Sequence, residues 1–470
     1  MSAKNEQTTQ DKALQLNLDE RKYGTIVEIG AGQEVARQFF RAGAAAGTIA
    51  KTMSAYDMQF SDAIYGAEPN RRYVSRNRVF AMLEREFSQV IERVRDTRPK
   101  SSTFFAYAAT VAAKSFNRNN ECHAWCGVRL QLYPEAPPSD IIVHVRMLDN
   151  NANAQQEALG VLGVNLIHSA YYHFSDPRKI IDSLTDGLEA DRLEIDSIEF
   201  FGPYFEEQDN RLLNLHLIRS WKTRAVMFNP EGEVRVPAEL LYKKNVLVTR
   251  GNFKPYTLLN EDMMEQGMRE FAQLVGVDED NTLRLAEITL NQLSSENEEI
   301  NDRDFIERVD QLTALGYHVM ISDYVRYFRL RAYFRQFTQK QIGIVMGMDA
   351  LRQIFDTDFY RGVEGGILEG FGKLFPDNTI VYAYPELGDD GEEITCQNIE
   401  LPESLQYLYQ HLTTNGYIRP INDSHAELFH IKSREVLTAI QHNREGWENS
   451  VPEAIAALIR EKCLFGYNTR

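Results

Sequence analysis

GYHVMISDYVRYFRLRAYFRQFTQKQIGIVMGMDA, from Gly316 to Ala350, is the part of the sequence on which the predicted architecture rests. It holds a short apolar run, a helical pattern rich in arginine and aromatic residues, and a second short apolar run. Gly316 follows an expected helix at Asp304–Leu315, where glycine commonly ends a helix. Short apolar strands alternating with helices are typical of parallel strands that are covered on both faces. The stretch therefore predicts a strand–helix–strand unit of a doubly wound, Rossmann-like α/β domain.

The same alternation continues on both sides of this stretch. The segment NTIVYAYP is a further expected strand, and Leu283–Leu290 is a strand or a short helix. We expect a Rossmann-like domain over residues 261–400. The last part of the chain, residues 401–470, reads as a helical C-terminal cap. Helices are expected at Asp262–Val275 and Asp349–Phe355 in the Rossmann-like domain. In the cap they are expected at Pro402–Thr414 and Pro452–Lys462.

The first half of the chain predicts a mixed α/β domain over residues 21–260, preceded by a disordered lead-in at residues 1–20. Apolar residues recur at helical spacing in Arg72–Val94, whereas Asp140–Leu148 alternates as a strand does. A polar connection within Tyr242–Thr257 places the domain boundary near residue 260. The other expected elements are strands at Trp125–Tyr133 and Leu193–Phe200 and helices at Gln155–Tyr172, Asp176–Leu188 and Asn210–Trp221.

Composition limits the classes of function. The 470 residues carry a net charge of -17, so we expect no nucleic-acid partner, because binding to phosphate backbones needs a concentrated basic surface. No run of about 18 uncharged apolar residues is present, and we expect no membrane partner. The first dozen residues lack the apolar core of a secretory signal, and the four cysteines are too few for a disulfide framework. A cytoplasmic location is the simplest interpretation.

The segment ECHAWC brings Cys122, His123 and Cys126 close together in the sequence. It could supply half of a zinc site, but structural zinc usually needs a second pair of ligands, which neither of the other cysteines provides. We therefore expect no metal site here and expect ordinary core thiols.

The stretch TIVEIGAGQEVARQFFRAGAAAGTIAKT resembles glycine-rich nucleotide loops. The dinucleotide pattern fails at Val35, the methyltransferase pattern fails at Glu34, and the phosphate-loop pattern fails in its spacing to Lys51. Close packing or self-association is the alternative, because Gly43 and Gly47 would share one face of a continuous helix. Packing, nucleotide binding and methyl transfer all stay open at this point.

Polar residues at predicted strand ends are the candidate ligand site. Ser322 and Asp323 follow one buried strand, and Gly347 and Asp349 follow the next one along the chain. Ligands of parallel α/β sheets bind beyond the carboxyl ends of strands. We therefore predict that these residues line one pocket, the second pair following the next strand along the chain.

Two further groups are weaker candidates for binding a ligand. His144 and Arg146 share one strand face and could hold an anion, although a solvated strand face explains them equally well. Gly365 and Gly366 lie in RGVEGGILEGFGKLF, which we interpret as a mobile flap over the same pocket. The carboxylates of Asp57, Asp62 and the neighbouring Tyr65 could serve acid–base or magnesium chemistry, or could be caps and surface groups.

Several stretches resemble a family of bacterial proteins whose members are often labelled nicotinate-nucleotide adenylyltransferase. They include ECHAWCGVRLQ, QQEALGVLGVNLI, ELLYKKNVLVTRGNF, ISDYVRYFRLRAYF and EGGILEGFGKLF, and the resemblance extends over nearly the whole chain. It implies a nucleotidyltransferase of NAD metabolism. The chain departs from that activity's usual pattern, because none of its ten histidines stands in a His-x-Gly-His stretch.

Two functional hypotheses follow. The first is a cytoplasmic protein that binds a nucleotide or phosphorylated metabolite, with Mg²⁺ accompanying the nucleotide as its expected cofactor. The second is a non-catalytic scaffold protein that assembles into a homo-oligomer through the small-residue stretch around Gly43. No catalytic residue is assigned by the sequence, and whether the protein is an enzyme stays open.

Overall fold

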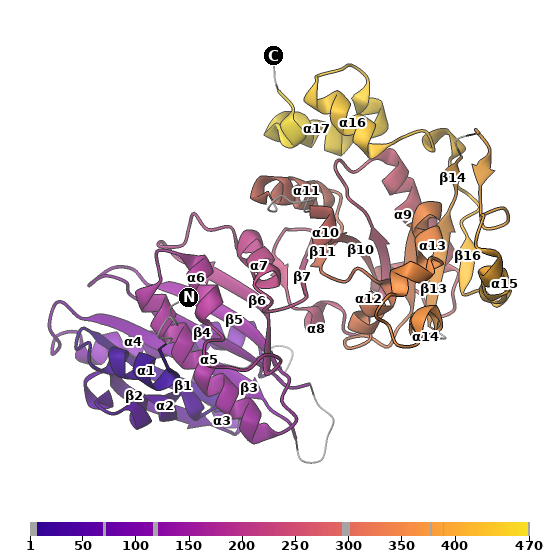
Figure 1. Ribbon diagram of the computed structural model, residues 1–470. Helices are drawn as coiled ribbons and strands as arrows, with labels where there is room; N and C mark the ends of the chain where they lie inside the picture. Colours follow the sequence, from indigo (N-terminus) through magenta and orange to yellow (C-terminus); the bar gives the residue numbers. More distant parts are fainter. Residues whose placement is uncertain are drawn as a thin grey trace, which may run out of the picture. The chain divides into compact units, whose positions relative to one another are not determined.

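The structure is a computed structural model that describes residues 7–68, 72–115, 121–293, 301–376, 378–388 and 390–468. The chain divides between Thr223 and Arg224 into two compact units, which Figure 1 shows in indigo to magenta and in red to yellow. Each unit contains its own sheet. The architecture is mixed α/β with parallel strands, as the sequence predicts.

The N-terminal unit is built on a six-stranded sheet. Its strands are β1 (Lys22–Gly30), β2 (Ile49–Ala55), β3 (Thr103–Ala112), β4 (His123–Leu130), β5 (Ser139–Met147) and β6 (Leu193–Phe201). Its helices are α1 (Thr9–Asn17), α2 (Glu34–Ala42), α3 (Met58–Tyr65), α4 (Arg76–Val94), α5 (Ala152–Tyr172), α6 (Pro177–Ser183) and α7 (Asn210–Arg219). The strand order is β2-β1-β3-β4-β5-β6. β1 pairs in parallel with β2 and β3, and the remaining pairs are antiparallel.

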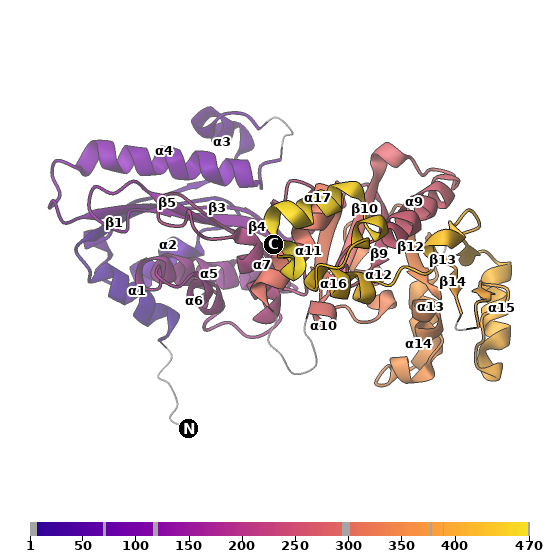
Figure 2. The same cartoon turned by 90° about the horizontal axis from the view of Figure 1, so that it is seen from above.

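Helices cover both faces of this sheet. Figure 2 shows α4 over one face and α1, α2, α5 and α6 over the other. The packing of α2 against α5 depends on glycine, because a Cβ at Gly163 would lie 2.3 Å from the Val35 side chain. This close approach buries α5 almost completely, from Gln155 to Tyr171. A residue with a larger side chain would force the two helices apart.

The C-terminal unit is built on an eight-stranded sheet. Its strands are β7 (Ala225–Phe228), β8 (Val234–Arg235), β9 (Asn245–Arg250), β10 (Thr282–Thr289), β11 (His318–Ser322), β12 (Ile342–Gly347), β13 (Thr379–Tyr384) and β16 (Ile418–Pro420). A separate ribbon pairs β14 (Glu386–Leu387) with β15 (Glu393–Ile394). The helices are α8 (Pro237–Leu240), α9 (Leu258–Ala272), α10 (Leu290–Leu293), α11 (Asp302–Ala314), α12 (Tyr327–Phe334), α13 (Met348–Ile354), α14 (Gly366–Leu374), α15 (Gln406–Thr414), α16 (Ser433–Gln441) and α17 (Glu453–Lys462).

The strand order of this sheet is β16-β13-β12-β9-β10-β11-β7-β8. The chain runs outward from β9 through β10 to β11, returns to β12 on the other side of β9, and then runs outward through β13 to β16. All strands from β16 to β11 are parallel, and the pairs β11–β7 and β7–β8 at one edge are antiparallel. This is the doubly wound order of the Rossmann fold, as the sequence predicts.

Alternate residues of β12 contact helices on opposite faces of the sheet. A Cβ at Gly343 would meet Phe271 of α9, and Val345 lies against Gly267 of the same helix. Ile344 and Met346 belong instead to the core formed with α12, α13 and α14. Because side chains alternate along a strand, Gly347 faces the α9 side.

Three expectations about organisation differ from the structure. The compact units divide at Thr223, not near residue 260, because β7 pairs with β11 and β9 lies at the centre of the second sheet. Residues 9–17 of the expected lead-in form α1, whose Leu16 is fully buried; residues 1–6 lie outside the described residues. The expected helical cap at residues 401–470 also contributes β16, which pairs with β13.

The division between the units predicts how fragments behave. We expect residues 224–470 to unfold cooperatively on heating, because they keep every strand of the second sheet. Residues 261–470 lack β7, β8 and β9, so β10 and β12 lose the strand between them, and we expect no cooperative transition. Circular dichroism of the two fragments checks this, with residues 1–223 as a control that should also melt cooperatively. A cooperative melt of 261–470 would contradict the boundary.

Candidate functional site

The switch point of the C-terminal sheet lies between β9 and β12, where the order of strands reverses. Ligands of open parallel sheets bind in the crevice outside the carboxyl ends of the strands at this point, because the connections diverge to opposite faces there. β12 ends at Gly347, and a Cβ built there would meet nothing within 4 Å. The carboxyl end of β12 therefore opens onto free space on the α9 side of the sheet.

Three polar side chains meet next to this space. Gly347 pairs in register with Tyr384, the last residue of β13, so both face the α9 side. The Tyr384 hydroxyl donates a hydrogen bond to Asp262 Oδ2 at 2.5 Å. His425 Nδ1 lies 2.6 Å from Asp262 Oδ1, and the His425 backbone N–H donates to Oδ2 at 3.1 Å. We call Asp262, Tyr384 and His425 the edge cluster.

The edge cluster combines a buried carboxylate with an exposed imidazole. The Asp262 side chain is 5% exposed, whereas that of His425 is 51% exposed. Burial alone would raise the pKa of Asp262, but hydrogen bonds, first from Tyr384 and then from Gln266, outweigh it and lower the pKa. The hydrogen bond and the charge of Asp262 raise the pKa of His425 above its ordinary value. Asp262 thus orients His425 and favours its imidazolium form.

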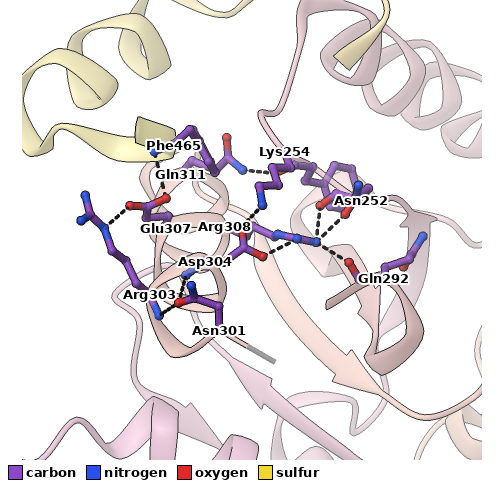
Figure 3. A network of polar contacts seen from close by, with 11 residues as sticks. Asn252, Lys254, Gln292, Asn301, Arg303, Asp304, Glu307, Arg308, Gln311 and Phe465 are labelled. Carbon is purple, nitrogen blue, oxygen red and sulfur yellow. Dashed lines mark hydrogen bonds and ion pairs between the residues drawn. The ribbon is translucent and has the colours of Figure 1, made fainter. Parts of the chain in front are cut away.

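The loop after β9 forms another part of this edge. Helix α11 holds this loop through Arg308, as Figure 3 shows. The Arg308 guanidinium donates hydrogen bonds to the backbone carbonyl and the side-chain oxygen of Asn252. It also donates to the Gln292 carbonyl at 2.7 Å. Arg308 also pairs with Asp304 of its own helix. Because Arg308 is only 4% exposed, this one guanidinium joins α11, the β9 loop and α10 in a buried network.

Two further contacts fix the same loop. Lys254 Nζ lies 2.6 Å from Asp304 Oδ1. Gln311 donates to the Phe253 carbonyl and accepts the Tyr256 backbone N–H at 2.8 Å. The loop therefore enters α9 in one defined conformation, and α9 carries Asp262 into the edge cluster.

The structure gives Ser322 and Asp323 structural partners. The Ser322 hydroxyl donates to Glu287 Oε1 at 2.6 Å, and Glu287 accepts two hydrogen bonds from Arg250, at 2.9 and 3.1 Å. Asp323 forms a double hydrogen bond with Arg224, at 2.8 and 2.9 Å. These groups hold the ends of β9, β10 and β11 together. Their ligand-binding role stays a prediction.

The four predicted pocket residues do not follow neighbouring strands of the sheet. Ser322 ends β11 and Gly347 ends β12, and β9 and β10 lie between those strands. Three strand spacings separate the two positions by about 14 Å. They are separated because the chain crosses back over β9 after β11, and a pocket that both positions line stays a prediction. Asp349 is nearer to Gly347 but is 92% exposed, and it pairs with Arg352 at 2.8 Å.

Gly365 and Gly366 lie at the start of α14. The Gly365 N–H donates to Glu369 Oε2 at 2.8 Å, and Gly366 has a φ of +57°, which favours glycine. The segment before them is tied to the residue that precedes α12, because Arg326 donates to the carbonyls of Phe359 and Arg361. A role for the two glycines in a flap stays a prediction.

His144 and Arg146 of β5 each have a carboxylate partner. His144 Nδ1 lies 2.5 Å from Asp196 Oδ1, and Arg146 Nη1 lies 2.6 Å from Glu194 Oε2. The Arg146 charge is therefore already compensated within the unit, and His144 is only 1% exposed. The hypothesis that the two side chains together hold an anion stays a prediction.

The first glycine stretch forms β1, a turn and α2, but its own acidic side chain occupies the start of the helix. Glu28 accepts the backbone N–H groups of Val35 and Ala36, at 3.3 and 3.4 Å. A phosphate would use the same N–H groups, so Glu28 competes directly with it. Burial raises the pKa of Glu28 to about 7. The turn is thus closed by a carboxylate that is partly neutral at physiological pH.

Gly43 and Gly47 do not share a helix face. α2 ends at Ala42, Gly43 has a φ of +85°, and Gly47 belongs to a short 3-10 helix at Ala45–Gly47. The expectation of one continuous helix was wrong, because Gly43 adopts a left-handed conformation that stops it. A Cβ at either glycine would meet nothing within 4 Å, so no close packing within the chain requires them. An interface role stays a prediction.

The smaller candidates also have partners. Asp57 caps α3 through Phe60, Asp62 pairs with Arg78 at 2.6 Å, and the Tyr65 hydroxyl donates to Glu86 at 2.7 Å. Across the described ranges, no group of three or more histidine, cysteine or acidic residues is arranged to hold a metal ion. In the same part of the chain, no helix is long and apolar enough to cross a membrane.

The sequence pattern does not indicate the edge cluster. Asp262 was interpreted as an ordinary helix residue, and Tyr384 as the end of a buried strand. His425 fell within residues expected to form a helical cap. The available signal was the short strand Ile418–Pro420, because a polar residue such as His425 just beyond a strand end is a site candidate by the same rule that selected Ser322.

Arg308 offers a test of the buried network. We expect Arg308→Met to lower the free energy of unfolding of the C-terminal unit by about 3 kcal/mol, because it leaves Asp304 and the Asn252 loop oxygens without their buried donor. Arg303→Met is the matched control on the same helix. It removes a 69% exposed side chain paired with Glu307, and we expect less than about 1 kcal/mol. Denaturant unfolding measures both, and equal losses would contradict the assigned role of Arg308.

His425 should titrate above its ordinary value. The pKa is raised in the folded state, so the stabilisation from the His425–Asp262 pair is fully present below about pH 6.5, the unfolded value, and disappears as pH rises through the folded pKa. Histidine-selective NMR measures the midpoint. We expect Asp262→Asn to lower that midpoint, and an unchanged midpoint in this variant would refute the coupling.

No protein-family model matches the sequence, and no curated protein sequence is significantly similar to it. Solved structures show partial likeness. The Plasmodium falciparum nicotinic acid mononucleotide adenylyltransferase complexed with APC shares 13% identity over 48% of this chain and 98% of its own, at a TM-score of 0.30. The competence/damage inducible protein CihA from Agrobacterium tumefaciens shares 12% sequence identity with this chain. The match covers 34% of this chain and 93% of CihA, at a TM-score of 0.26. A CinA superfamily protein from Klebsiella pneumoniae shares 9% sequence identity. The match covers 36% of this chain and 99% of that protein, at a TM-score of 0.28. At these TM-scores the likeness carries no functional argument.

Proposed function

We propose that this chain is a cytoplasmic protein that binds a nucleotide or phosphorylated metabolite at the carboxyl edge of its C-terminal sheet. The observation that carries the proposal is the reversal of strand order between β9 and β12, next to the open space at Gly347. The four cysteines are too few and too scattered for a disulfide framework, which fits a reducing compartment.

The chemistry of the edge cluster supports an anionic ligand. His425 presents an exposed imidazole ring whose other nitrogen, Nδ1, is held by Asp262. As an imidazolium it offers an N–H donor and a positive charge, and charge-assisted hydrogen bonds of this kind are the strong ones for phosphate oxygens. Tyr384 and Asp262 fix its position, so the ligand does not have to order the ring when it binds.

Nucleotidyl transfer in NAD metabolism is the reaction that we propose to assay first. The support is the resemblance of ELLYKKNVLVTRGNF and the other stretches to the family that carries this label. The His-x-Gly-His pattern is missing, so His425 would take the role of the cation beside the phosphates. Mg²⁺ bound with the nucleotide would supply the remaining charge compensation that phosphoryl chemistry needs.

A self-assembling scaffold is the second candidate, and one observation favours it. Gly43 and Gly47 leave open space beside them, and the side chain of Phe40 in the preceding helix is 55% exposed. An apolar residue next to small ones on an accessible surface suits contact with another copy of the chain.

Gly347→Leu tests the site. We expect the native chain to show a rise in Tm with at least one of ATP, NAD⁺, nicotinate mononucleotide and S-adenosylmethionine, each measured with and without Mg²⁺. Gly347→Leu should lose that rise, because its side chain fills the space where the ligand binds. Gly372→Leu is the matched control, since Gly372 also has open space at its Cβ position but lies in α14.

The outcomes separate the two candidates. A shift that survives Gly347→Leu would contradict the placement of the site. No shift with any compound would count against ligand binding, and light scattering that then showed an oligomer at micromolar concentration would favour the scaffold. A monomer in that experiment would remove the scaffold.

A further inference from the structure

The N-terminal unit contains a second cluster of titratable side chains, which the proposed function does not use. His123 begins β4, His144 lies in β5 and Asp196 lies in β6, on three neighbouring strands. His123 Nδ1 lies 3.0 Å from His144 Nε2, and His144 Nδ1 lies 2.5 Å from Asp196 Oδ1. We call this chain of hydrogen bonds the relay.

A bulge in β6 aims Asp196 at His144. His144 pairs with Ser197 and Val145 pairs with Ile195, so Asp196 is an extra residue between two paired positions. Bulges commonly redirect a side chain that a regular strand would turn to the other face. The local backbone irregularity therefore brings the carboxylate to the imidazole, and regular pairing of these strands would not.

Burial makes the relay costly unless its charges are paired. Asp196 is 2% exposed and His144 is 1% exposed, while His123 is partly exposed. Asp196 Oδ2 has no hydrogen-bond partner among the described residues. A buried carboxylate with an unsatisfied oxygen costs free energy that an apolar residue would not. The relay thus points from a buried negative charge to a nitrogen near the surface.

The hydrogen bonds fix the tautomers of both rings. Ionised Asp196 can only accept, so His144 must carry its proton on Nδ1. In its neutral form His144 then has a lone pair on Nε2, which accepts the Nδ1 proton of His123. Neutral His123 therefore keeps a lone pair on Nε2, the outermost nitrogen of the relay.

We propose that His123 Nε2 is the general base of a second site in the N-terminal unit, one that deprotonates water for hydrolysis of an activated acyl bond. His144 and Asp196 are its positioning residues, and they act only through His123. This site is independent of the edge cluster and of the proposed ligand.

The proton balance is complete without another reactant. The water oxygen attacks the acyl carbon while one water proton moves to His123 Nε2, and the leaving group departs with the electrons of the broken acyl bond. The Asp196 carboxylate favours the positive charge that forms on His123, whereas burial and His144 oppose it. Loss of the proton from His123 to solvent restores the base. Aspartate acts on the histidine of serine hydrolases through the same logic, by holding a tautomer and stabilising an imidazolium.

Burial and the neighbouring cationic groups keep His123 neutral in mild acid. Burial and then the neighbouring His144 lower the pKa of His123 to about 4. Asp196 opposes this effect, and Arg72 and Arg146 reinforce it. The other carboxylates close by are Glu121 and Glu194, whose pKa values are raised by burial. An ordinary histidine, with a pKa of about 6.5, is mostly protonated at pH 5, but His123 stays an available base.

Hydrolysis of 4-nitrophenyl acetate by the full chain tests the base. We expect activity to persist from pH 7 down to pH 5, and His123→Gln to lower the pH 5 rate by about tenfold or more. His216→Gln is the matched control, because His216 also pairs with an aspartate, Asp182, in the same unit. A pH 5 rate unchanged by His123→Gln would overturn the proposal.

Asp196→Asn tests the relay by a readout that simple loss of packing would not produce. An amide at residue 196 can donate to His144 Nδ1, which moves the His144 proton to Nε2. His123 Nδ1 must then accept, and its own proton moves to Nε2, so the lone pair of the base disappears. We expect histidine-selective ¹⁵N NMR to show this tautomer change at His123 together with loss of the pH 5 activity.

Two measurements keep the test decisive. Asp182→Asn should leave the His123 tautomer unchanged, because the Asp182–His216 pair is separate from the relay. The native chain itself should show Nδ1-protonated rings at both His123 and His144. This measurement needs no variant, so it holds even if a variant fails to fold. Nε2-protonated His123 in the native chain would overturn the proposal.

Discussion

Parallel pairing of β9 with β10 on one side and with β12 on the other is the interaction on which the C-terminal unit depends. It makes β9 the centre of the sheet and places the reversal of strand order beside it. Arg250 at the end of β9 strengthens this arrangement, because its buried pair with Glu287 joins β9 to β10. Since the strands run parallel, their carboxyl ends share one edge. The open space at Gly347 and the edge cluster both lie there.

Buried charge is used in two ways in this protein. Arg250, Glu287 and Arg308 are paired with other groups of the same unit, so they hold strands and loops together. Asp262 holds the exposed His425, and Asp196 holds the buried His144, which in turn contacts the partly exposed His123. The first kind stabilises the fold, and the second positions a ring nitrogen for chemistry. The difference lies in whether the chain of hydrogen bonds ends inside the protein or at an accessible atom.

Local patterns allowed much of the fold to be predicted, and pairing partners explain what was missed. The strands at Ile342–Gly347 and His318–Ser322 were predicted because short apolar runs between helices indicate buried parallel strands. The boundary near residue 260 was wrong because β7 and β9 pair with strands far along the chain. At the candidate site, Gly347 was selected by its place after a strand. Asp262 and His425 are 163 residues apart, and no local pattern connects them.

The sequence by itself determined the α/β class, the doubly wound second half and the failure of the first glycine stretch to match a nucleotide loop. These follow from periodicity and spacing, which are local properties of the chain. Only the tertiary structure decided that Glu28 occupies the start of α2, that Ser322 and Gly347 end strands three positions apart, and that Asp196 meets His144 through a bulge. The physical reason is that strand order and register are set by long-range hydrogen bonding and burial, and these bring together side chains that are distant in sequence.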